Sequence, residues 1–522
     1  MKKIYLILLL SFLCFFHKVF AQTPTWQWAQ AAIGSQGLVA QNGIGVDAAG
    51  NTYITGYGYT SNGINFGNTT LPPIGMFLAK YNAAGKLVWA KHRTTSTPIA
   101  LYTDAAGNGY ITGRYRDTLR AGNTTFLCQG FSDIFVMKFD SAGNMAWARK
   151  AGGPGYPPGF PPPILSEDEG RSIAADTAGN VYVSGFYFAT QNTTATFDSI
   201  SFSIPANSPI NYDYGFLAKY NAFGHIQWVR RLDFRGHRPE VTVSVNKKGD
   251  CFVTGYFGDT LYLSNNVKLG SKGRSDAYYA RYNTNGNLIW AKSFGGADDE
   301  FNQRISVNKQ DECFLSGTFN SPNLPIGNTS LSGSTNRGTV YIAKCDSSGN
   351  IIWATQTTGS GSIGDSDMAI DTAGNAYLAS SFTGTVTIGQ QTITASSGTG
   401  SLAVSKWSSS GVPLWAVTAQ GRSGSFHIAA GGAPDVCYIS GDFEGSLGLG
   451  IHSLYSQNFG VFAAKLNSNP TSISEAFSQE LFPLPESGAK RAVSEPAGSK
   501  RNCSDAAYRY AGQNRTFPAN AS

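Results

Sequence analysis

Residues 176–185 read Asp-Thr-Ala-Gly-Asn-Val-Tyr-Val-Ser-Gly, and residues 216–229 read Phe-Leu-Ala-Lys-Tyr-Asn-Ala-Phe-Gly-His-Ile-Gln-Trp-Val. The Asp-x-x-Gly-Asn and Asn-x-x-Gly segments favour tight turns, because Gly accepts positive φ and Asx side chains bind nearby backbone amides. The apolar residues on either side alternate with a period of two, which is typical of β-strands. These stretches therefore predict antiparallel strands joined by short turns.

The same phrases recur along the chain. An aromatic-x-x-Gly strand occurs six times, and Tyr377–Ser380 is a degenerate seventh copy. Because the same residue is needed in each copy, we interpret the recurring Trp and basic positions as architectural: Trp fills the space between sheets, and the basic side chain lies along apolar surface with its charge in water. The intervals between the tryptophans are 61, 58, 81, 62, 63 and 62 residues, at Trp28, Trp89, Trp147, Trp228, Trp290, Trp353 and Trp415. The basic positions are Lys80, Lys138, Lys219, Arg281, Lys344, Lys406 and Lys465.

Each copy predicts four antiparallel strands, and such units repeated radially form a β-propeller. The chain begins its repeats with the end of a unit, Thr25 to Ala29, and the seventh copy stops at Asn467 without a Trp strand. Pairing the first strand with the seventh copy would remove two exposed sheet edges. We therefore predict an all-β, seven-bladed propeller over residues 22–470, closed by its N-terminal strand.

The repeated phrases also carry a family resemblance. Residues 47–56, residues 176–185 and the Phe-x-Ala-Lys-Tyr-Asn…Trp-Ala phrase resemble the bacterial seven-bladed β-propeller repeat (SBBP) family. The resemblance covers roughly residues 25–467. It implies a propeller that is secreted or on the cell surface, and it brings no general catalytic motif.

The N-terminal segment has the three parts of a secretory signal. Lys2 and Lys3 precede an apolar run over residues 4–16, and Val-Phe-Ala ends at residue 21. The run is shorter than the roughly 20 apolar residues that span a bilayer. We expect a signal peptide over residues 1–21, no transmembrane segment afterwards, and a protein that is secreted or on the outer cell surface.

The C-terminal segment, residues 471–522, lacks the repeat and is rich in Ser, Pro, Lys and Arg. Residues 481–488, Leu-Phe-Pro-Leu-Pro-Glu-Ser-Gly, resemble the start of the sorting domain used in type IX secretion. Residues 489–522 do not continue as alternating strands. The tail therefore resembles a truncated or altered sorting region, with the secretion machinery as its partner.

Composition excludes several classes of protein. Only 14% of the residues are charged, and removal of residues 1–21 lowers the net charge from +6 to +3. So small a surplus gives no reason to expect a nucleic-acid partner. Six cysteines remain after residue 21 without C-x-x-C spacing, which excludes a disulfide-dense scaffold and the usual zinc site. We expect most of them to be buried single thiols.

The Asp-x-x-Gly-Asn turns at Asp47, Asp104, Asp176 and Asp371 offer carboxylates that suit calcium. They lack the dense ligand series of a calcium loop. An Asx turn explains them without a metal. We therefore expect no cofactor, with calcium as the alternative.

We look for binding residues in the loops that differ between the copies. The loops that lead into the first strand of a unit carry acidic residues, and one of these loops instead carries basic residues together with Glu240. Carboxylates that converge near the axis could bind a cation, a basic ligand or a sugar; a solvated rim is the alternative. The candidate ligand-binding residues are Glu167, Asp168, Glu169, Arg235, His237, Arg238, Asp298, Asp299, Glu300, Asp365 and Asp367.

The sequence contains no Gly-x-Ser-x-Gly, His-Glu-x-x-His or GxxxxGK[ST] motif, and we assign no catalytic residue. We predict a non-catalytic binding or scaffolding module for extracellular protein or glycan partners. The alternative is a carbohydrate-active hydrolase or lyase that uses the acidic groups.

Overall fold

The computed structural model describes residues 23–34, 37–93, 96–155, 167–189, 192–204, 212–234, 240–264, 267–333, 338–396, 400–431 and 433–468. All of them belong to the unit Met1–Thr471. The predicted signal peptide over residues 1–21 and the tail over residues 471–522 lie outside the described residues. Every regular element in the described ranges is a β-strand, so the prediction of an all-β fold is confirmed.

The strands form antiparallel meanders of four, numbered here in chain order. Meander 1 contains β2 (Gly37–Val46), β3 (Thr52–Thr60), β6 (Ile74–Tyr81) and β7 (Leu87–His92). Meander 2 contains β8 (Thr97–Thr103), β9 (Gly109–Tyr115), β12 (Asp133–Phe139) and β13 (Met145–Gly152). Meander 3 contains β14 (Glu169–Ala175), β15 (Val181–Ala189), β18 (Tyr212–Tyr220) and β19 (Ile226–Phe234). Meander 4 contains β20 (Thr242–Val245), β21 (Cys251–Phe257), β24 (Asp276–Tyr282) and β25 (Leu288–Phe294).

The later meanders repeat this order, and meander 7 takes its fourth strand from the N-terminal segment. Meander 5 contains β26 (Glu300–Val307), β27 (Cys313–Phe319), β30 (Thr339–Cys345) and β31 (Ile351–Gln356). Meander 6 contains β33 (Ser362–Ile370), β34 (Ala376–Thr383), β37 (Ser401–Trp407) and β38 (Pro413–Thr418). Meander 7 contains β39 (Gln420–Ala430), β40 (Val436–Leu449), β41 (His452–Asn467) and β1 (Thr25–Gly34).

Short hairpins between the second and third strands of a meander reach toward the preceding one. Hairpin strand β4 pairs with β1, β16 with β13, β22 with β19 and β35 with β32, whereas β10–β11 and β28–β29 form separate two-stranded sheets. The hairpin strands are β4 (Ile64–Asn65), β5 (Thr70–Leu71), β10 (Thr118–Ala121), β11 (Thr124–Leu127), β16 (Thr194–Phe197), β17 (Ile200–Ser203), β22 (Thr260–Ser264), β23 (Val267–Gly270), β28 (Asn323–Ile326), β29 (Thr329–Ser332), β35 (Thr385–Ile388) and β36 (Gln391–Thr394). The short strand β32 (Thr358–Gly359) follows β31.

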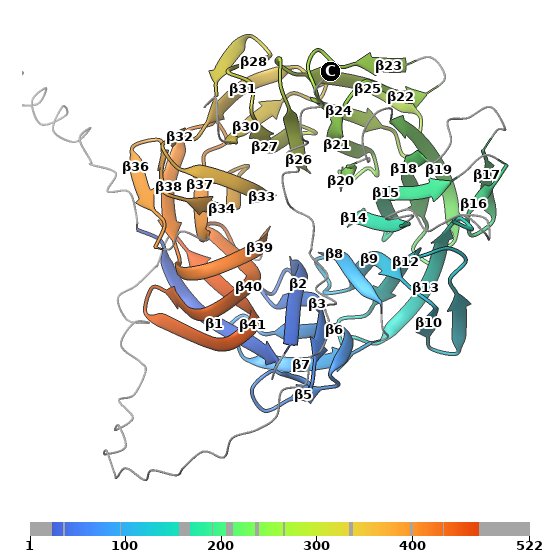
Figure 1. The fold of residues 1–522 in the computed structure, drawn as a ribbon, viewed down its shortest axis with the longest axis horizontal. Helices are drawn as coiled ribbons and strands as arrows, with labels where there is room; N and C mark the ends of the chain where they lie inside the picture. Colours follow the sequence, from blue (N-terminus) through green and yellow to red (C-terminus); the bar gives the residue numbers. More distant parts are fainter. Residues whose placement is uncertain are drawn as a thin grey trace, which may run out of the picture. The chain divides into compact units, whose positions relative to one another are not determined.

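The first strands of the meanders lie nearest to one another. Each contacts the first strand of the next meander, in the order β2, β8, β14, β20, β26, β33, β39, and β39 contacts β2. Figure 1 shows these strands toward the middle of the view and the later strands of each meander further out. Loops that lead into first strands therefore gather at one end of these strands.

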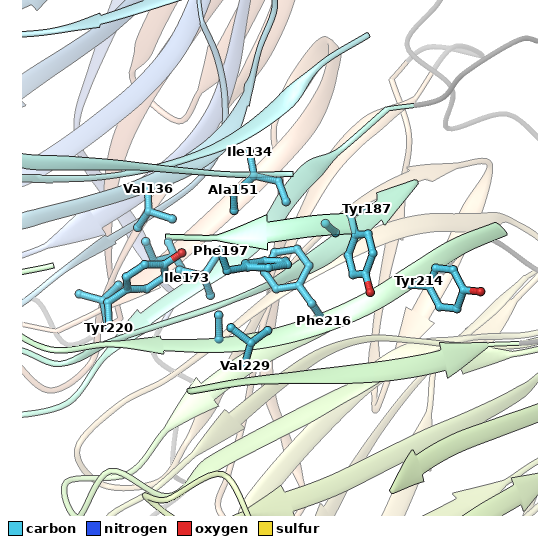
Figure 2. Packing of buried hydrophobic residues seen from close by; sticks show 14 of the residues in the cluster. Ile134, Val136, Ala151, Ile173, Tyr187, Phe197, Tyr214, Phe216, Tyr220 and Val229 are labelled. Atoms are coloured by element: carbon cyan, nitrogen blue, oxygen red, sulfur yellow. The ribbon is translucent and has the colours of Figure 1, made fainter. Parts of the chain in front are cut away.

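Apolar side chains fill the space between neighbouring meanders. Figure 2 shows the cluster between meanders 2 and 3, where Ile134 and Val136 face Phe197, Phe216 and other buried residues. Successive side chains of a strand point to opposite faces of its sheet. Each sheet packs against one neighbouring meander on either face, so both faces are apolar. The core is therefore a series of clusters between meanders.

Five repeated tryptophans of the described meanders donate an indole hydrogen bond to the next meander: Trp28, Trp147, Trp228, Trp290 and Trp353. The indole Nε1 of Trp28 donates a hydrogen bond to the Ala83 carbonyl oxygen at 3.2 Å, and that of Trp147 donates to Ala222 at 3.0 Å. Gly85 lies against the Trp28 ring with φ of 80°, and a Cβ there would come within 2.6 Å of the ring. The glycine before the fourth strand thus supplies both the turn and the space for the indole.

The repeated basic residue lies directly opposite the tryptophan of its own meander. Lys80 pairs with Trp89, and Lys465 pairs in the same way with Trp28. The Lys80 ammonium also lies 4.8 Å from the centroid of the Tyr53 ring. The expectation that this charge faces water is wrong for Lys219, Lys344 and Lys406, which are all buried. Lys406 is the least exposed of them, at 2%, because acidic side chains from two turns and the Tyr377 ring enclose its ammonium.

The Asp-x-x-Gly-Asn turns use their carboxylates within the turn. Asp47 Oδ1 accepts hydrogen bonds from the backbone amides of Ala49 and Asn51, at 3.0 and 2.9 Å. Its Oδ2 accepts hydrogen bonds from Asn51 Nδ2 and the Tyr53 hydroxyl. This is the Asx-turn geometry, and the turns at Asp104, Asp176 and Asp371 repeat it.

Two cysteines differ from the expected single thiols. Cys313 on β27 and Cys345 on β30 are direct cross-strand partners and form a disulfide, with a Cα–Cα distance of 5.2 Å. This pairing could not be predicted from the sequence, because the two residues are 32 positions apart and only the register of the two strands brings them together.

Candidate functional site

The acidic group before meander 3 lies against arginines of meander 2. Glu167 and Glu169 both form ion pairs with Arg114, the latter at 2.9 Å. Glu167 is also 2.9 Å from Arg116, and Glu169 is 2.7 Å from Arg171. Only 4% of Glu167 and 3% of Glu169 are exposed, so these carboxylates do not form the solvated rim that the sequence allowed.

Asp168 points into the protein. Its carboxylate accepts hydrogen bonds from the backbone amides of Gly153 and Phe188, both at 2.7 Å. Burial raises the pKa of Asp168 well above its ordinary value, and the neighbouring Asp133 raises it further. Asp168 therefore serves the contact between meanders 2 and 3 instead of a solvent-facing site.

The acidic residues before meander 5 differ in burial: one is buried and two are partly exposed. Glu300 is fully buried, and its Oε2 accepts a hydrogen bond from the Gly296 amide at 2.6 Å. Burial raises the pKa of Glu300, and Asp276 adds to this effect. Asp298 and Asp299 are partly exposed, and Asp299 lies 3.9 Å from the exposed Arg274 side chain. Only these two acids of the group are accessible to a ligand.

Asp367 on β33 connects three first strands. Its carboxylate is 2.6 Å from Arg304 Nε on β26, and it accepts a hydrogen bond from the Ile428 amide on β39 at 3.0 Å. His427 Nδ1 lies 3.5 Å away. Burial alone would raise the pKa of Asp367, but Arg304 and His427 lower it below the ordinary range. Asp365 belongs to the same strand, and its side chain lies outside the described residues.

The basic candidates Arg235, His237 and Arg238 also lie outside the described residues. Glu240 is the first described residue after them and is partly exposed.

The described acidic groups each find partners in their own or an adjoining meander. Glycoside cleavage needs two carboxyl groups about 5–10 Å apart that both face the substrate. Glu167 and Glu169 instead share Arg114, and Asp367 binds Arg304. The arrangement therefore supports fixed contacts between sheets more directly than acid–base chemistry on a sugar.

Sequence reasoning missed the partners of these acids. Arg114 and Arg304 lie about one repeat away from the carboxylates they bind, at the interval that brings neighbouring meanders together. Ser132-Asp133 and Ser275-Asp276 form a second repeated signal: Ser132 makes a parallel bridge with Glu167, and Ser275 makes one with Asp299. A comparison of the copies at this position could have placed the acids beside the preceding meander.

Asp442 on β40 provides a pH test of the contact between meanders 7 and 1. Its carboxylate accepts a hydrogen bond from the backbone N–H of Gln41 on β2 at 2.6 Å, and burial raises the pKa of Asp442 to about 8. The pKa of an aspartate in the unfolded chain is about 3.9. Between pH 4 and 8 the folded protein therefore binds more protons than the unfolded chain, and its free energy of unfolding falls as the pH rises through this window.

Asp442→Asn keeps an acceptor oxygen without the charge. We expect the variant to exceed the parent in free energy of unfolding at pH 8.5 by about 1 kcal/mol or more, with little difference at pH 4. Urea unfolding at both values measures this difference. Parallel pH profiles for the variant and the parent would contradict the assignment.

Repeated four-stranded meanders whose first strands contact one another in turn define a β-propeller repeat protein. Within the described residues, no helix is long and apolar enough to cross a membrane, and no group of three or more His, Cys, Asp or Glu side chains is suited to a metal ion.

No family model matches the chain. The chain is 23% identical over 404 residues to an uncharacterized WD repeat-containing protein of Acanthamoeba polyphaga mimivirus, and the match covers 63% of this chain and 28% of that protein. Among solved structures, the WD40 repeats of RRP9 match with a TM-score of 0.41 and 8% identity, over 85% of this chain and 98% of that one. A protein of unknown function from Dyadobacter fermentans matches with a TM-score of 0.36 and 11% identity, over 85% and 99%.

Proposed function

We propose that this chain is a secreted seven-bladed β-propeller, closed by β1, that acts as a non-catalytic binding module for a protein or glycan outside the cell. Each meander would be one blade. The observation that carries the proposal is a constant internal frame combined with hairpins and loops that differ between copies.

The contacts of β1 support closure. Trp28 lies opposite Lys465, as Trp89 lies opposite Lys80, and its Nε1 donates to the Ala83 carbonyl of meander 1. The N-terminal strand thus makes the contacts that the fourth strand makes in other meanders. If β1 closes the ring in this way, every meander has a neighbouring meander on both sides.

The distribution of constant and variable positions supports binding. Trp, the basic residue and the turn carboxylates are used within and between meanders, so they hold the frame. The loops before the first strands vary in length and charge, and they gather at one end. Variable loops on a rigid scaffold are the usual location of binding residues.

The Cys313–Cys345 disulfide supports export, because disulfides persist in oxidising compartments outside the cytosol. The secretory pattern of residues 1–21 and the resemblance of residues 481–488 to a type IX sorting region suggest the same route. We propose that the chain belongs to the SBBP family and is exported by the type IX system. Retention in the periplasm of a host that has this system would count against export by that route.

The purified protein, screened on a glycan array and against isolated surface proteins, is expected to bind at least one of them. Asp298→Ala/Asp299→Ala removes the two accessible acids and is expected to lower affinity at least tenfold for a ligand held at that end. Asp259→Ala, in an exposed turn, is the control.

Equal binding by the double variant and the parent would remove this acidic pair from the site. Absence of any partner would overturn the binding function. Release of reducing sugar from an array glycan would favour the hydrolase or lyase alternative.

A further inference from the structure

A cavity of about 780 Å³ lies between the outer strand of meander 1 and the hairpin of meander 2. Lys91 and His92 of β7 and Arg93, which follows this strand, form one side of the cavity. Arg120 of β10 contributes to the other side. The β10–β11 hairpin forms its own sheet and does not pair with β7, whereas the corresponding hairpin strand β16 pairs with β13. The missing pairing accounts for the open space at this position.

The cavity is lined by basic side chains from both meanders. Lys91, Arg93 and Arg120 carry positive charge, and His92 lies between the first two. None of the described residues that line it is acidic. Asp140, in the adjoining turn, accepts hydrogen bonds from two amides of its own turn, and its charge also interacts with Lys91. One carboxylate beside three cations leaves the lining with a surplus of positive charge.

The guanidinium of Arg93 is fixed in position before any ligand binds. Its Nη1 donates to the His92 carbonyl oxygen at 3.2 Å, and its Nη2 donates to the Gly143 carbonyl oxygen. The group lies over the Phe139 ring, 5.3 Å from its centroid. The Nε atom is buried and has no hydrogen-bond partner. Nη1 and Nη2 each carry a second N–H that these two bonds do not use, and these are the donors that Arg93 offers to an oxyanion.

The lining also contains apolar surface. Met145 contributes a partly exposed thioether side chain, Met137 a buried one, and Gly122 leaves the opening free of a side chain. The volume falls within the 300–1,000 Å³ range of ligand sites and is larger than a single ion needs. The cavity therefore suits an extended ligand with negative groups and apolar C–H surface between them.

We propose that this cavity, called here the basic groove, binds an acidic polysaccharide through its carboxylate or sulfate groups. Arg93 and Arg120 bind the oxyanions, because a guanidinium presents a planar set of donors to such groups. Lys91, whose Nζ is 3.0 Å from Asn144 Oδ1, adds a positive charge at the rim. The proposal rests on the proposed binding function and adds a site distinct from the acidic groups.

Binding is measured by calorimetry with polygalacturonate as the carboxylate probe, dextran sulfate as the sulfate probe and neutral dextran as the blank. We expect binding of at least one anionic probe, and weaker binding as NaCl rises from 50 to 300 mM. Arg93→Gln/Arg120→Glu is expected to lower affinity at least tenfold. Arg93 also binds the Gly143 carbonyl in the Asp140 turn of meander 2, so its replacement can disturb the fold. Arg120 is exposed, so Arg120→Glu is tested alone as well, and we expect a threefold or greater loss.

Lys248→Gln/Lys268→Gln removes two exposed lysines elsewhere and is the charge control; its affinity should stay within twofold of the parent. If neither anionic probe binds, the groove is not a polysaccharide site. An equal loss of affinity in the control variant, or equal affinity of the parent for duplex DNA, would also contradict the proposal. If all groove variants still bind their partner on the array, the groove is not the binding site, and the proposed binding function stands. If the protein binds no glycan and no protein at all, the proposed function itself is wrong.

Discussion

Deletion of residues 23–31 is expected to lower the melting temperature by roughly 10 °C or more, or to prevent folding. The deletion removes most of β1, which pairs with β41 from Thr25 to Ile33. It also removes Trp26 and Trp28, both buried, and the loss of a buried aromatic side chain costs about 3–5 kcal/mol. The edge of β41 would then be exposed, with the risk of aggregation that an unpaired strand brings. Thermal unfolding followed by circular dichroism measures the effect.

A matched control tests the same strand without removing its pairing. Gln30 on β1 is exposed, and Gln30→Ala should change the melting temperature little. A synthetic peptide of residues 23–34 added to the deletion variant is expected to restore part of the lost stability. An unchanged melting temperature after deletion would contradict closure of the propeller by this strand.

Lys406→Ala is expected to lower the free energy of unfolding by about 3–5 kcal/mol. The Lys406 ammonium forms an ion pair with Asp435, lies 3.8 Å from Asp371 and lies 5.0 Å from the centroid of the Tyr377 ring. Asp371 is buried, so removal of the lysine leaves a buried carboxylate without its counter-charge. Denaturant unfolding with a far-ultraviolet signal measures the loss.

Lys80→Ala is the matched control from meander 1. Its side chain is 13% exposed, and it lies 3.8 Å from one carboxylate, that of Asp47. Because water reaches this charge more easily, we expect a loss of about 1–2 kcal/mol. Equal losses for the two variants would contradict burial as the reason for the larger effect at Lys406.

The repeated frame could be predicted because its causes are local. The Asp47 turn follows from an Asx residue with Gly and Asn at fixed distances, and Trp28 and Lys465 are recognised by their place in the repeat. The environment of the acids could not be predicted in the same way. Glu167 carries the same formal charge whether it faces water or Arg114, and the choice depends on which residues lie opposite in the next meander.

The sequence by itself determined the all-β class, the turns and the positions of the strands, because short-range turn chemistry and period-two alternation act within a few residues. Only the tertiary structure decided that Glu167, Glu169 and Asp367 are engaged with arginines, that Cys313 and Cys345 form a disulfide, and that a basic groove opens beside β7. These features depend on the register between strands and on contacts between residues about one repeat apart. Burial and charge pairing act through distances in space, and those distances exist only once the meanders pack together.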